Sequence, residues 1–518
     1  MIRSFLTVST GTLASRLLGF ARDSMIAALL GAGPVADAFL VAFQLVNVVR
    51  RLLTEGALNT ALVPAWLRLR EAEGAAAAAA FAGRVLGTVS AVLVVTAAIL
   101  GLAMPLVISA LAPGFIGHET LQLAVDDSRL MLPYLGFAGP VAVMMGLLNA
   151  QGRFALTAFS PVLFNITLIV VMLALLVWRR DASMAAWVTA ATVGIAGLLQ
   201  LLILVLPGGS LATPPQISFD AAMRGFFGKA IPGMIASAGP QWLVVAGAII
   251  ASSSPSAVSW LYFANRLIEL PLGIVGVAMG TVLVPELTRA LRGDDSAAMA
   301  HAESRGLELA VGLALPATLG LIVLSTPVVR MLFEHGAFTA EDTAATAQAL
   351  IWLALGLPAH VLVKALSPAF FARDDTLTPL LATLKGFVVA VVLALLLGRL
   401  FGAAGIAASI AAGAWSSALA LIRRGASTFG FSIDAAARRR LPRIVLAALV
   451  MGGLLWLTAR FALPLLANIH GLAQAAVLLV LIAGGIAAYG GLLGFLGVTG
   501  WRETLNAIRQ PPRSDLRA

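Results

Sequence analysis

Long apolar stretches constrain the fold of this chain more than any other feature. They recur from end to end of the sequence, and each has the roughly 20 residues that a helix needs to cross a hydrocarbon core of about 30 Å. Only 11% of the 518 residues are charged, against about 25% in soluble domains. Continuous apolar runs such as Val85–Ala112 also lack the alternating polarity of membrane barrels. The sequence therefore predicts an all-α polytopic membrane protein.

The spacing of these stretches predicts 14 transmembrane helices, including a closely connected pair at 378–398 and 402–422. The positive charges orient them. With the N-terminus in the cytoplasm, 21 of the 34 lysines and arginines fall in cytoplasmic segments and six fall on the opposite face. Because lysine and arginine are enriched in cytoplasmic loops, we expect both termini in the cytoplasm.

A proline- and glycine-rich segment at 207–216 (PGGSLATPPQ) cannot continue a helix and divides the chain. The expected domains are an N-terminal lobe of six helices at 1–206, a cytoplasmic linker at 207–228, a six-helix lobe at 229–422, two further helices at 443–498 and a cytoplasmic tail at 499–518. The return of TALVP (60–64) as TVLVP (281–285) indicates a parallel repeat of the two lobes. Apolar residues at 219–227 fit either a short interfacial helix or the start of the next membrane helix.

Several function classes lack their sequence signals. The chain has no cysteine, which excludes disulfides, thiolate metal sites and cysteine nucleophiles. It contains no phosphate-binding loop and no HExxH motif. We therefore expect no enzyme activity, no metal site and no cofactor. The net charge of +10 is attributed to cytoplasmic loops, so nucleic acid is not an expected partner.

Five arginines interrupt the expected membrane helices, at Arg16, Arg22, Arg50, Arg51 and Arg266. A central arginine costs roughly 2.5 to 3.5 kcal/mol on insertion scales. Together, facing lipid, the five would cost about as much as a whole domain's stability. We therefore expect them to face protein or water.

Other polar residues follow these arginines at helical spacing. On the second helix Asp37, Gln44, Asn47, Arg51 and Glu55 share one face, within about 40° of the Arg51 direction. On the first helix Arg16 and Asp23 lie on one face. Arg266 and Glu269 are spaced to pair at i, i+3. His360, Lys364 and Lys385 are weaker candidates, and a single histidine on an apolar helix more often packs than relays protons.

Two interpretations of these charges remain open. In the first, ion pairs between the arginines and the acids Asp23, Asp37, Glu55 and Glu269 merely join helices. In the second, the positive surplus, to which two lysines add, binds an anionic ligand. The planar guanidinium fork suits phosphate, so a diphosphate headgroup fits the second interpretation.

Four segments closely resemble a known family: SRLLGFARD (15–23), DAFLVAFQLVNVVRRLLTEGALNTALVP (37–64), YFANRLIELPLGIVGVAMGTVLVP (262–285) and LSPAFFARDDTLTP (366–379). The family is MurJ (MviN), the lipid II flippases of the MOP exporter superfamily. The resemblance implies two six-helix lobes around a cationic cavity, alternating access, and a groove for the polyprenyl tail between the last two helices. It also implies that the five arginines bind substrate, with the four acids as partners.

The resemblance implies that the chain lies in the bacterial inner membrane. It implies lipid II and membrane lipids as partners, and cell-wall synthesis proteins are further candidates. Membrane potential or an ion gradient would drive transport. The alternatives are a flippase for another undecaprenyl-linked glycan, a MATE-like drug or cation antiporter, and a non-transporting scaffold. A cation antiporter is expected to need an acidic cavity, so the surplus of arginines argues against it. A flippase for another undecaprenyl-linked glycan would bind the same diphosphate as a lipid II flippase, so the charges do not separate these two.

Overall fold

A computed structural model describes residues 2–54, 57–178, 180–208, 211–237, 247–278, 283, 296–371, 373, 375–429, 434–465 and 471–498. In these ranges every regular element is a helix. Nine of the helices found there are long and apolar enough to cross a membrane. The expected all-α polytopic membrane fold is therefore confirmed, whereas the number of 14 helices stays a prediction. Glu55, four residues of the second TVLVP motif and the tail at 499–518 lie outside the described residues.

The chain forms two compact units, of which unit 1 comprises Met1–Phe263 and Leu332–Thr343 and unit 2 comprises Ala264–Met331 and Ala344–Ala518. The expected lobe boundaries stay a prediction. The helices of unit 1 are α1 (Ile2–Leu30), α2 (Pro34–Thr54), α3 (Ala57–Ala72), α4 (Ala75–Leu111), the short 3-10 helix η1 (Pro113–Phe115), α5 (Glu119–Met131), α6 (Pro133–Ala150), α7 (Phe154–Val177), α8 (Ala182–Gly208) and α9 (Ala221–Ser237). The helix α11 (Ala257–Ala278) begins in unit 1 and continues into unit 2.

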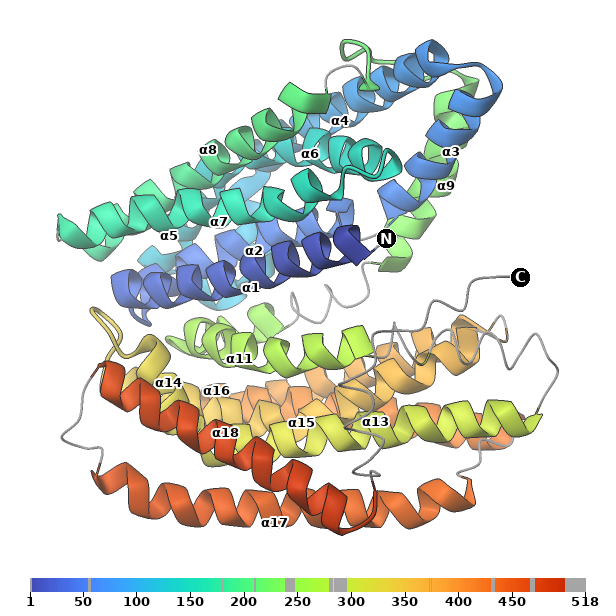
Figure 1. The fold of residues 1–518 in the computed structure, drawn as a ribbon. Coiled ribbons are helices and arrows are strands. Elements are labelled where there is room, and N and C mark those ends of the chain that lie inside the picture. Colours follow the sequence, from blue (N-terminus) through green and yellow to red (C-terminus); the bar gives the residue numbers. More distant parts are fainter. Residues whose placement is uncertain are drawn as a thin grey trace. The chain divides into compact units, whose positions relative to one another are not determined.

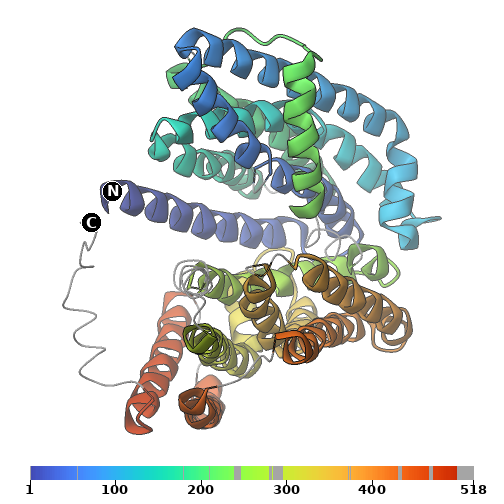
Figure 2. The same cartoon turned by 90° about the vertical axis from the view of Figure 1, so that its right-hand side faces the viewer.

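In unit 1, α1 lies along α7, α2 packs on α5, and α4 and α8 both pack on α6 (Figures 1 and 2). Gly11 of α1 allows close approach, because a Cβ there would stand 2.7 Å from the Cβ of Ala158 on α7. Tyr134 of α6 meets Phe164 of α7 edge to face, with the ring centres 5.5 Å apart. The first contact fixes α1, which carries three of the predicted site residues, against α7, and the second fixes α7 against α6.

The linker runs along the start of α4. The backbone amides of Thr213 and Gln216 donate to the carbonyls of Ala79 and Gly83, at 3.0 and 3.1 Å. Asp220 then accepts from Arg84 at 2.7 Å and caps α9 through the Met223 amide at 2.8 Å. This part of the linker is therefore bound to the N-terminal helices.

The α9 helix continues from this cap without a break to Ser237. Phe226 is buried and meets Phe81 of α4 edge to face at 5.9 Å. The apolar residues at 219–227 thus begin a longer, packed helix, which favours that alternative over a separate interfacial helix.

Unit 2 also contains α13 (Ser296–Val323), α14 (Ser325–Phe333), α15 (Ala340–Phe371), α16 (Leu377–Phe429), α17 (Ala435–Leu465) and α18 (Leu472–Phe495), with α14 and α15 each partly in unit 1. Within it, α13 packs on α17 and α17 packs on α18. A non-helical Gly402 (φ 55°) breaks α16 into two runs, where the sequence predicts two closely connected helices.

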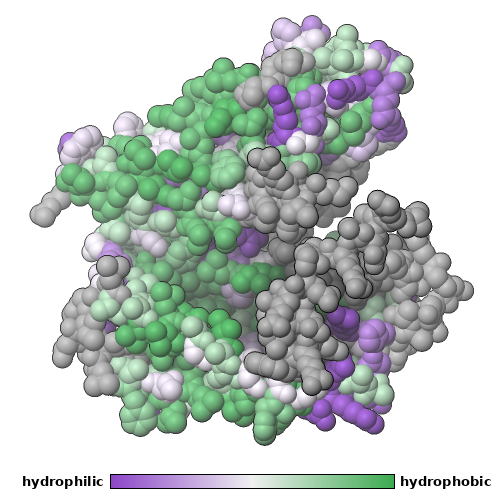
Figure 3. Space-filling model, in the orientation of Figure 1, coloured by the Kyte–Doolittle hydropathy of each residue, from purple (hydrophilic) through white to green (hydrophobic). Residues whose placement is uncertain are grey.

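Large apolar side chains remain exposed on both units, for example Leu102 and Leu106 on α4 and Val480 and Ile486 on α18. Figure 3 shows apolar residues over much of the visible surface. A soluble monomer rarely exposes so much contiguous apolar surface, whereas helices that satisfy their own backbone polar groups can face hydrocarbon. The outer faces are therefore suited to lipid.

Candidate functional site

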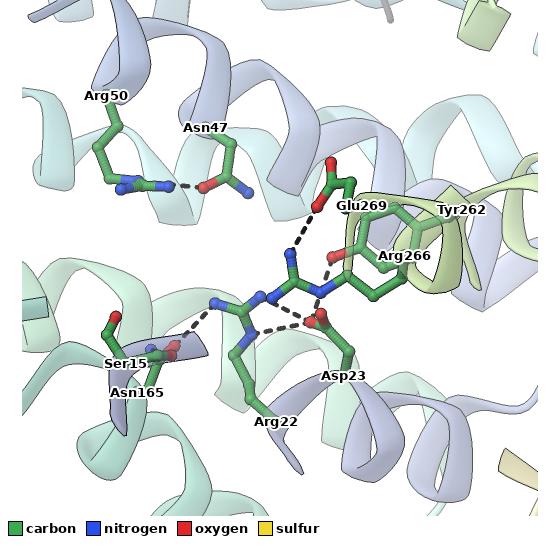
Figure 4. Close-up of polar contacts among 9 residues, drawn as sticks. All are labelled: Ser15, Arg22, Asp23, Asn47, Arg50, Asn165, Tyr262, Arg266 and Glu269. Atoms are coloured by element: carbon green, nitrogen blue, oxygen red, sulfur yellow. Dashed lines mark hydrogen bonds and ion pairs between the residues drawn. The ribbon is translucent and has the colours of Figure 1, made fainter. Parts of the chain in front are cut away.

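The first predicted cluster forms around Arg22 in the C-terminal half of α1 (Figure 4). Arg22 is 8% exposed and Asp23 is fully buried. The Arg22 Nε and Nη2 groups donate to Asp23 Oδ1 at 3.0 and 2.6 Å. Adjacent residues on a helix point about 100° apart, so this contact depends on the long arginine side chain bending back toward its neighbour. The charges of Arg22 and Asp23 therefore neutralise one another.

Two further residues, Asn165 and Tyr262, which the sequence pattern did not indicate, complete this cluster. Arg22 Nη1 donates to Asn165 Oδ1 of α7 at 2.9 Å, and Asn165 Nδ2 donates to the Ser15 carbonyl at 3.2 Å. The Tyr262 hydroxyl donates to Asp23 Oδ1 at 3.2 Å. An asparagine inside the apolar run at 157–178 and a tyrosine directly before FANR were the available signals.

Arg22 also lies over the ring of Phe43 on α2, with its guanidinium carbon 4.9 Å from the ring centre. Such a cation–π contact is stronger where water is excluded. The guanidinium is thus held from three sides, by α1, α2 and α7, and three of its five N–H donors are used in these bonds.

Arg16, two turns before Asp23, is exposed. Among the described residues no carboxylate lies within ion-pair distance of it. A charge on an exposed face of an apolar helix is expensive unless that face meets water or a counter-charge. Of the two arginines Arg16 and Arg22, Arg16 is therefore the more available to an anion.

Of the polar residues predicted on α2, the structure brings only some together. Arg50 Nε donates to Asn47 Oδ1 at 3.3 Å, and Gln44, Asn47, Arg50 and Arg51 are all half-buried. The helix ends at Thr54, directly before Glu55, which lies outside the described residues.

Asp37 corrects one expectation, since it pairs with no arginine in the part of the chain that the structure describes. It lies at the start of α2, 14 residues or about 21 Å from Arg51 along the helix. Its carboxylate instead accepts from the backbone amide of Ser259 at 2.9 Å and from the Ser259 hydroxyl. Ser259 is in the first turn of α11, so Asp37 joins α2 to the start of α11.

Further contacts surround this junction. The Ala337 amide donates to the Ala28 carbonyl at 2.8 Å, and Gly336 comes so close to α1 that a Cβ there would overlap the Ala28 oxygen. Trp260 Nε1 donates to Asp342 Oδ1 at 3.0 Å. We call these contacts, with Asp37–Ser259, the end clasp. It binds segments 257–263 and 332–343, which follow the linker in sequence, to the ends of α1 and α2.

The second arginine cluster is on α11. Arg266 Nη1 lies 2.8 Å from Glu269 Oε2, with side chains 22% and 33% exposed, which confirms the pairing expected from their i, i+3 spacing. Lys364 of α15 is exposed, and its Nζ would lie 3.8 Å from a Cβ on Gly276 of α11. Gly276 follows Glu269 by seven residues on the same helix face, so Lys364 adds positive charge to that face.

The remaining candidates stand apart. His360 is half-buried on α15, one turn before Lys364, and no hydrogen bond to its ring is seen among the described residues. Lys385 is exposed on α16 and shows no described contact with the other candidates. No group of three or more metal-binding side chains occurs in the described ranges.

Comparison with known proteins gives the family. The family model described as lipid II flippase MurJ matches residues 26–473. A probable lipid II flippase MurJ of Rhizobium tropici is 36% identical to this chain, over 100% of this chain and 99% of the relative.

Solved structures agree in fold. The lipid II flippase MurJ in an inward closed conformation matches with a TM-score of 0.78 and 23% identity, over 96% of this chain and 100% of that one. An inward-facing MATE family transporter of the MOP superfamily matches with a TM-score of 0.66 and 14% identity, over 85% and 98%. The extent of the family match and the full-length relative show that this chain belongs to the MurJ family.

Proposed function

We propose that this chain is a flippase that moves lipid II, an undecaprenyl-diphosphate-linked headgroup, from the cytoplasmic to the periplasmic leaflet of the bacterial inner membrane. The observation that carries the proposal is the family match over residues 26–473 together with arginines on α1 and α11 inside apolar helices. Transport needs no chemical step on the substrate, and we propose no enzyme activity.

The charges of α1 and α11 support an anionic cargo. Each helix has one arginine held beside a carboxylate, Arg22 with Asp23 and Arg266 with Glu269, and α1 adds the exposed Arg16. A diphosphate offers several acceptor oxygens to guanidinium donors, and charge-assisted bonds of this kind are roughly twice as strong as neutral ones. In this proposal Arg16, Arg50, Arg51 and Arg266 contact the headgroup. Arg22 stays near Asp23 and contributes its remaining N–H donors.

The end clasp supports alternating access. It closes the ends of α1 and α2 onto α11 and the 332–343 segment through hydrogen bonds and a few close backbone contacts. Breaking such contacts costs little enough free energy that substrate binding to the open state can compensate for it. With both termini in the cytoplasm, the clasp lies on the periplasmic side, and its opening would release the headgroup there.

The charge of the cargo indicates what supplies the energy for transport. Moving about two negative charges out of a negative interior is favoured by roughly 2.3 kcal/mol per charge per 100 mV. Membrane potential therefore supplies part of the energy in this proposal. If transport into vesicles continues unchanged after the potential is collapsed, this part of the proposal is wrong.

A cation antiporter is less compatible with these charges, because Asp23 and Glu269 each already face an arginine. A carrier for another undecaprenyl-linked glycan would present the same diphosphate, so its exclusion requires a direct assay. Contacts with cell-wall synthesis proteins belong to the same proposal and would be found by crosslinking in cells.

The deciding experiment depletes the protein in cells and adds, from outside, an enzyme that cleaves lipid II exposed on the periplasmic leaflet. We expect cleavage to fall, to be restored by the wild type, and not to be restored by Arg266→Ala at equal abundance. Arg399→Ala on the exposed face of α16 is the control and should restore cleavage fully. Continued cleavage after depletion, in cells without a second flippase, would contradict the proposal.

A further inference from the structure

A groove lies between α4 and the junction of α5 and α6 in unit 1, away from the arginine clusters. It has a volume of about 550 Å³ and is lined by Val94, Ala98 and Gly101 of α4 and by Arg129, Leu132 and Gly136 across from them. Its size falls in the range of about 300 to 1,000 Å³ that small-molecule sites have. Apart from Arg129, its lining residues are small or apolar.

Arg129 is the one charged residue among those that line this groove. It is exposed, and its Nε group donates to the Gly101 carbonyl at 3.1 Å. This bond fixes the guanidinium beside Gly101, which is the lining residue of α4 nearest in sequence to the α4–α5 connection. In the described ranges no other bond to Arg129 is seen, so its two terminal amino groups remain available to an acceptor.

The nearby acid does not neutralise Arg129. Asp126, one turn earlier on α5, accepts from Gln122 Nε2 at 2.9 and 3.1 Å, and no ion pair joins Asp126 to Arg129 within the described residues. The groove therefore has a fixed positive charge at one end.

The other end of the groove is apolar. Val94 lies about two helical turns from Gly101, the partner of Arg129, along α4. Gly136 lies beside Val94, since a Cβ on Gly136 would stand 3.5 Å from a Val94 methyl. Around the groove, Val95, Ile99 and Leu102 of α4 are more than half exposed, which suits hydrocarbon. The site thus combines one guanidinium with an apolar part, lined by Val94, Ala98 and Gly136, which we call the furrow.

We propose that this groove binds a glycerophospholipid of the surrounding membrane. Its phosphate accepts hydrogen bonds from the Arg129 terminal amino groups, and one acyl chain lies in the furrow between Ala98 and Gly136. A free anion would use only the arginine, and a plain hydrocarbon would use only the furrow, whereas a phospholipid uses both. In the proposed orientation the lipid belongs to the periplasmic leaflet. This site is independent of the transported cargo.

Native mass spectrometry of the detergent-purified full chain tests the proposal, with dioleoyl phosphatidylglycerol as the probe and dioleoylglycerol, which lacks the phosphate, as its matched control. Arg129→Ala should weaken phosphatidylglycerol binding about tenfold, as expected for loss of a charge-assisted bond, without changing dioleoylglycerol binding. Ala98→Trp fills the exposed furrow, leaves the charge in place, and should weaken both. Arg399→Ala should change neither.

Arg129→Gln provides a second variant that keeps a donor for the Gly101 carbonyl if the alanine variant does not fold, and it should weaken phosphatidylglycerol binding similarly. Equal phosphatidylglycerol binding by the wild type, Arg129→Gln and Ala98→Trp would overturn the proposal. So would displacement of phosphatidylglycerol from the wild type by an equimolar undecaprenyl diphosphate lipid with no such displacement in Ala98→Trp, because the groove would then belong to the cargo.

Discussion

Two arginine–carboxylate pairs, one on α1 and one on α11, lie in different surroundings. Arg22 and Asp23 on α1 are buried and are joined by Asn165, Tyr262 and Phe43. Arg266 and Glu269 on α11 are 22% and 33% exposed. A buried pair is costly to break, because removing one partner leaves the other charge in a medium that solvates it poorly. A partly exposed pair can exchange its carboxylate for another anion at little cost. We therefore expect the α1 pair to hold α1 in place, and the α11 pair is the better candidate to exchange ligands.

The largest effect on stability is expected at Asp23. Asp23→Ala leaves the Arg22 guanidinium without the carboxylate oxygen that accepts two of its N–H groups. We expect a loss of about 3 to 5 kcal/mol, measured as the fall in unfolding temperature of the detergent-purified protein. Asp23→Asn retains an acceptor and should lose less. Equal stability of all three proteins would show that the pair is not structural.

A buried carboxylate without an arginine extends the comparison. Asp127 of α5 precedes the apolar span that begins at Pro133 and is 4% exposed; no hydrogen bond to its side chain is seen among the described residues. Burial, with a smaller contribution from the charge of Asp126, raises the pKa of Asp127 from 3.8 to about 7. Without a cation beside it, the carboxyl holds its proton.

This raised pKa gives stability a pH dependence. The folded protein keeps the Asp127 proton up to about pH 7, whereas the unfolded chain releases it near 3.8. The contribution to stability is therefore complete below pH 3.8 and is lost as the pH rises through 7. It amounts to at most about 4 kcal/mol. Asp127→Asn should match the wild type near pH 4 and exceed its unfolding temperature at pH 8. A variant less stable than the wild type at pH 8 would contradict this assignment.

We expect a smaller free-energy change when the end clasp is weakened, because each of its hydrogen bonds has at most one charged partner. Since the chain contains no cysteine, Val258→Cys beside Ser259 introduces a single thiol at a position that is 2% exposed. Adding Asp37→Ala removes the acceptor of the Ser259 amide and should raise the rate of thiol labelling about tenfold, as loss of roughly 1.5 kcal/mol would. The parent with Asp37 intact is the control. Unchanged labelling would show that this bond does not hold the clasp closed.

The sequence predicted the parts of this molecule that depend on local patterns. Apolar length predicted the nine helices of the described ranges that are long enough to cross a membrane. Gly402 breaks α16 at the start of the second helix expected at 402–422, and the i, i+3 spacing predicted the Arg266–Glu269 pair. Contacts between distant segments were not predictable in this way. Helical spacing placed Asp37 on the face of Arg51, but it carries no information about Ser259, 222 residues later. Asn165 and Tyr262 were missed because each is an isolated uncharged polar residue, and only tertiary packing brings them to Arg22 and Asp23.

The smallest effect on stability, and the sharpest test of the comparison, is expected at Arg266. Exposed ion pairs contribute about 0 to 1 kcal/mol, so Arg266→Ala should shift the unfolding temperature little compared with Asp23→Ala. Its transport of lipid II should nevertheless fall at least about tenfold, because a charge-assisted contact to the cargo is lost. Glu269→Gln removes the competing carboxylate charge and should keep stability while strengthening binding of the anionic cargo. If Arg266→Ala instead destabilises the protein as much as Asp23→Ala, then the α11 pair is structural as well, and exchange of its carboxylate for the substrate cannot be the step that binds the diphosphate.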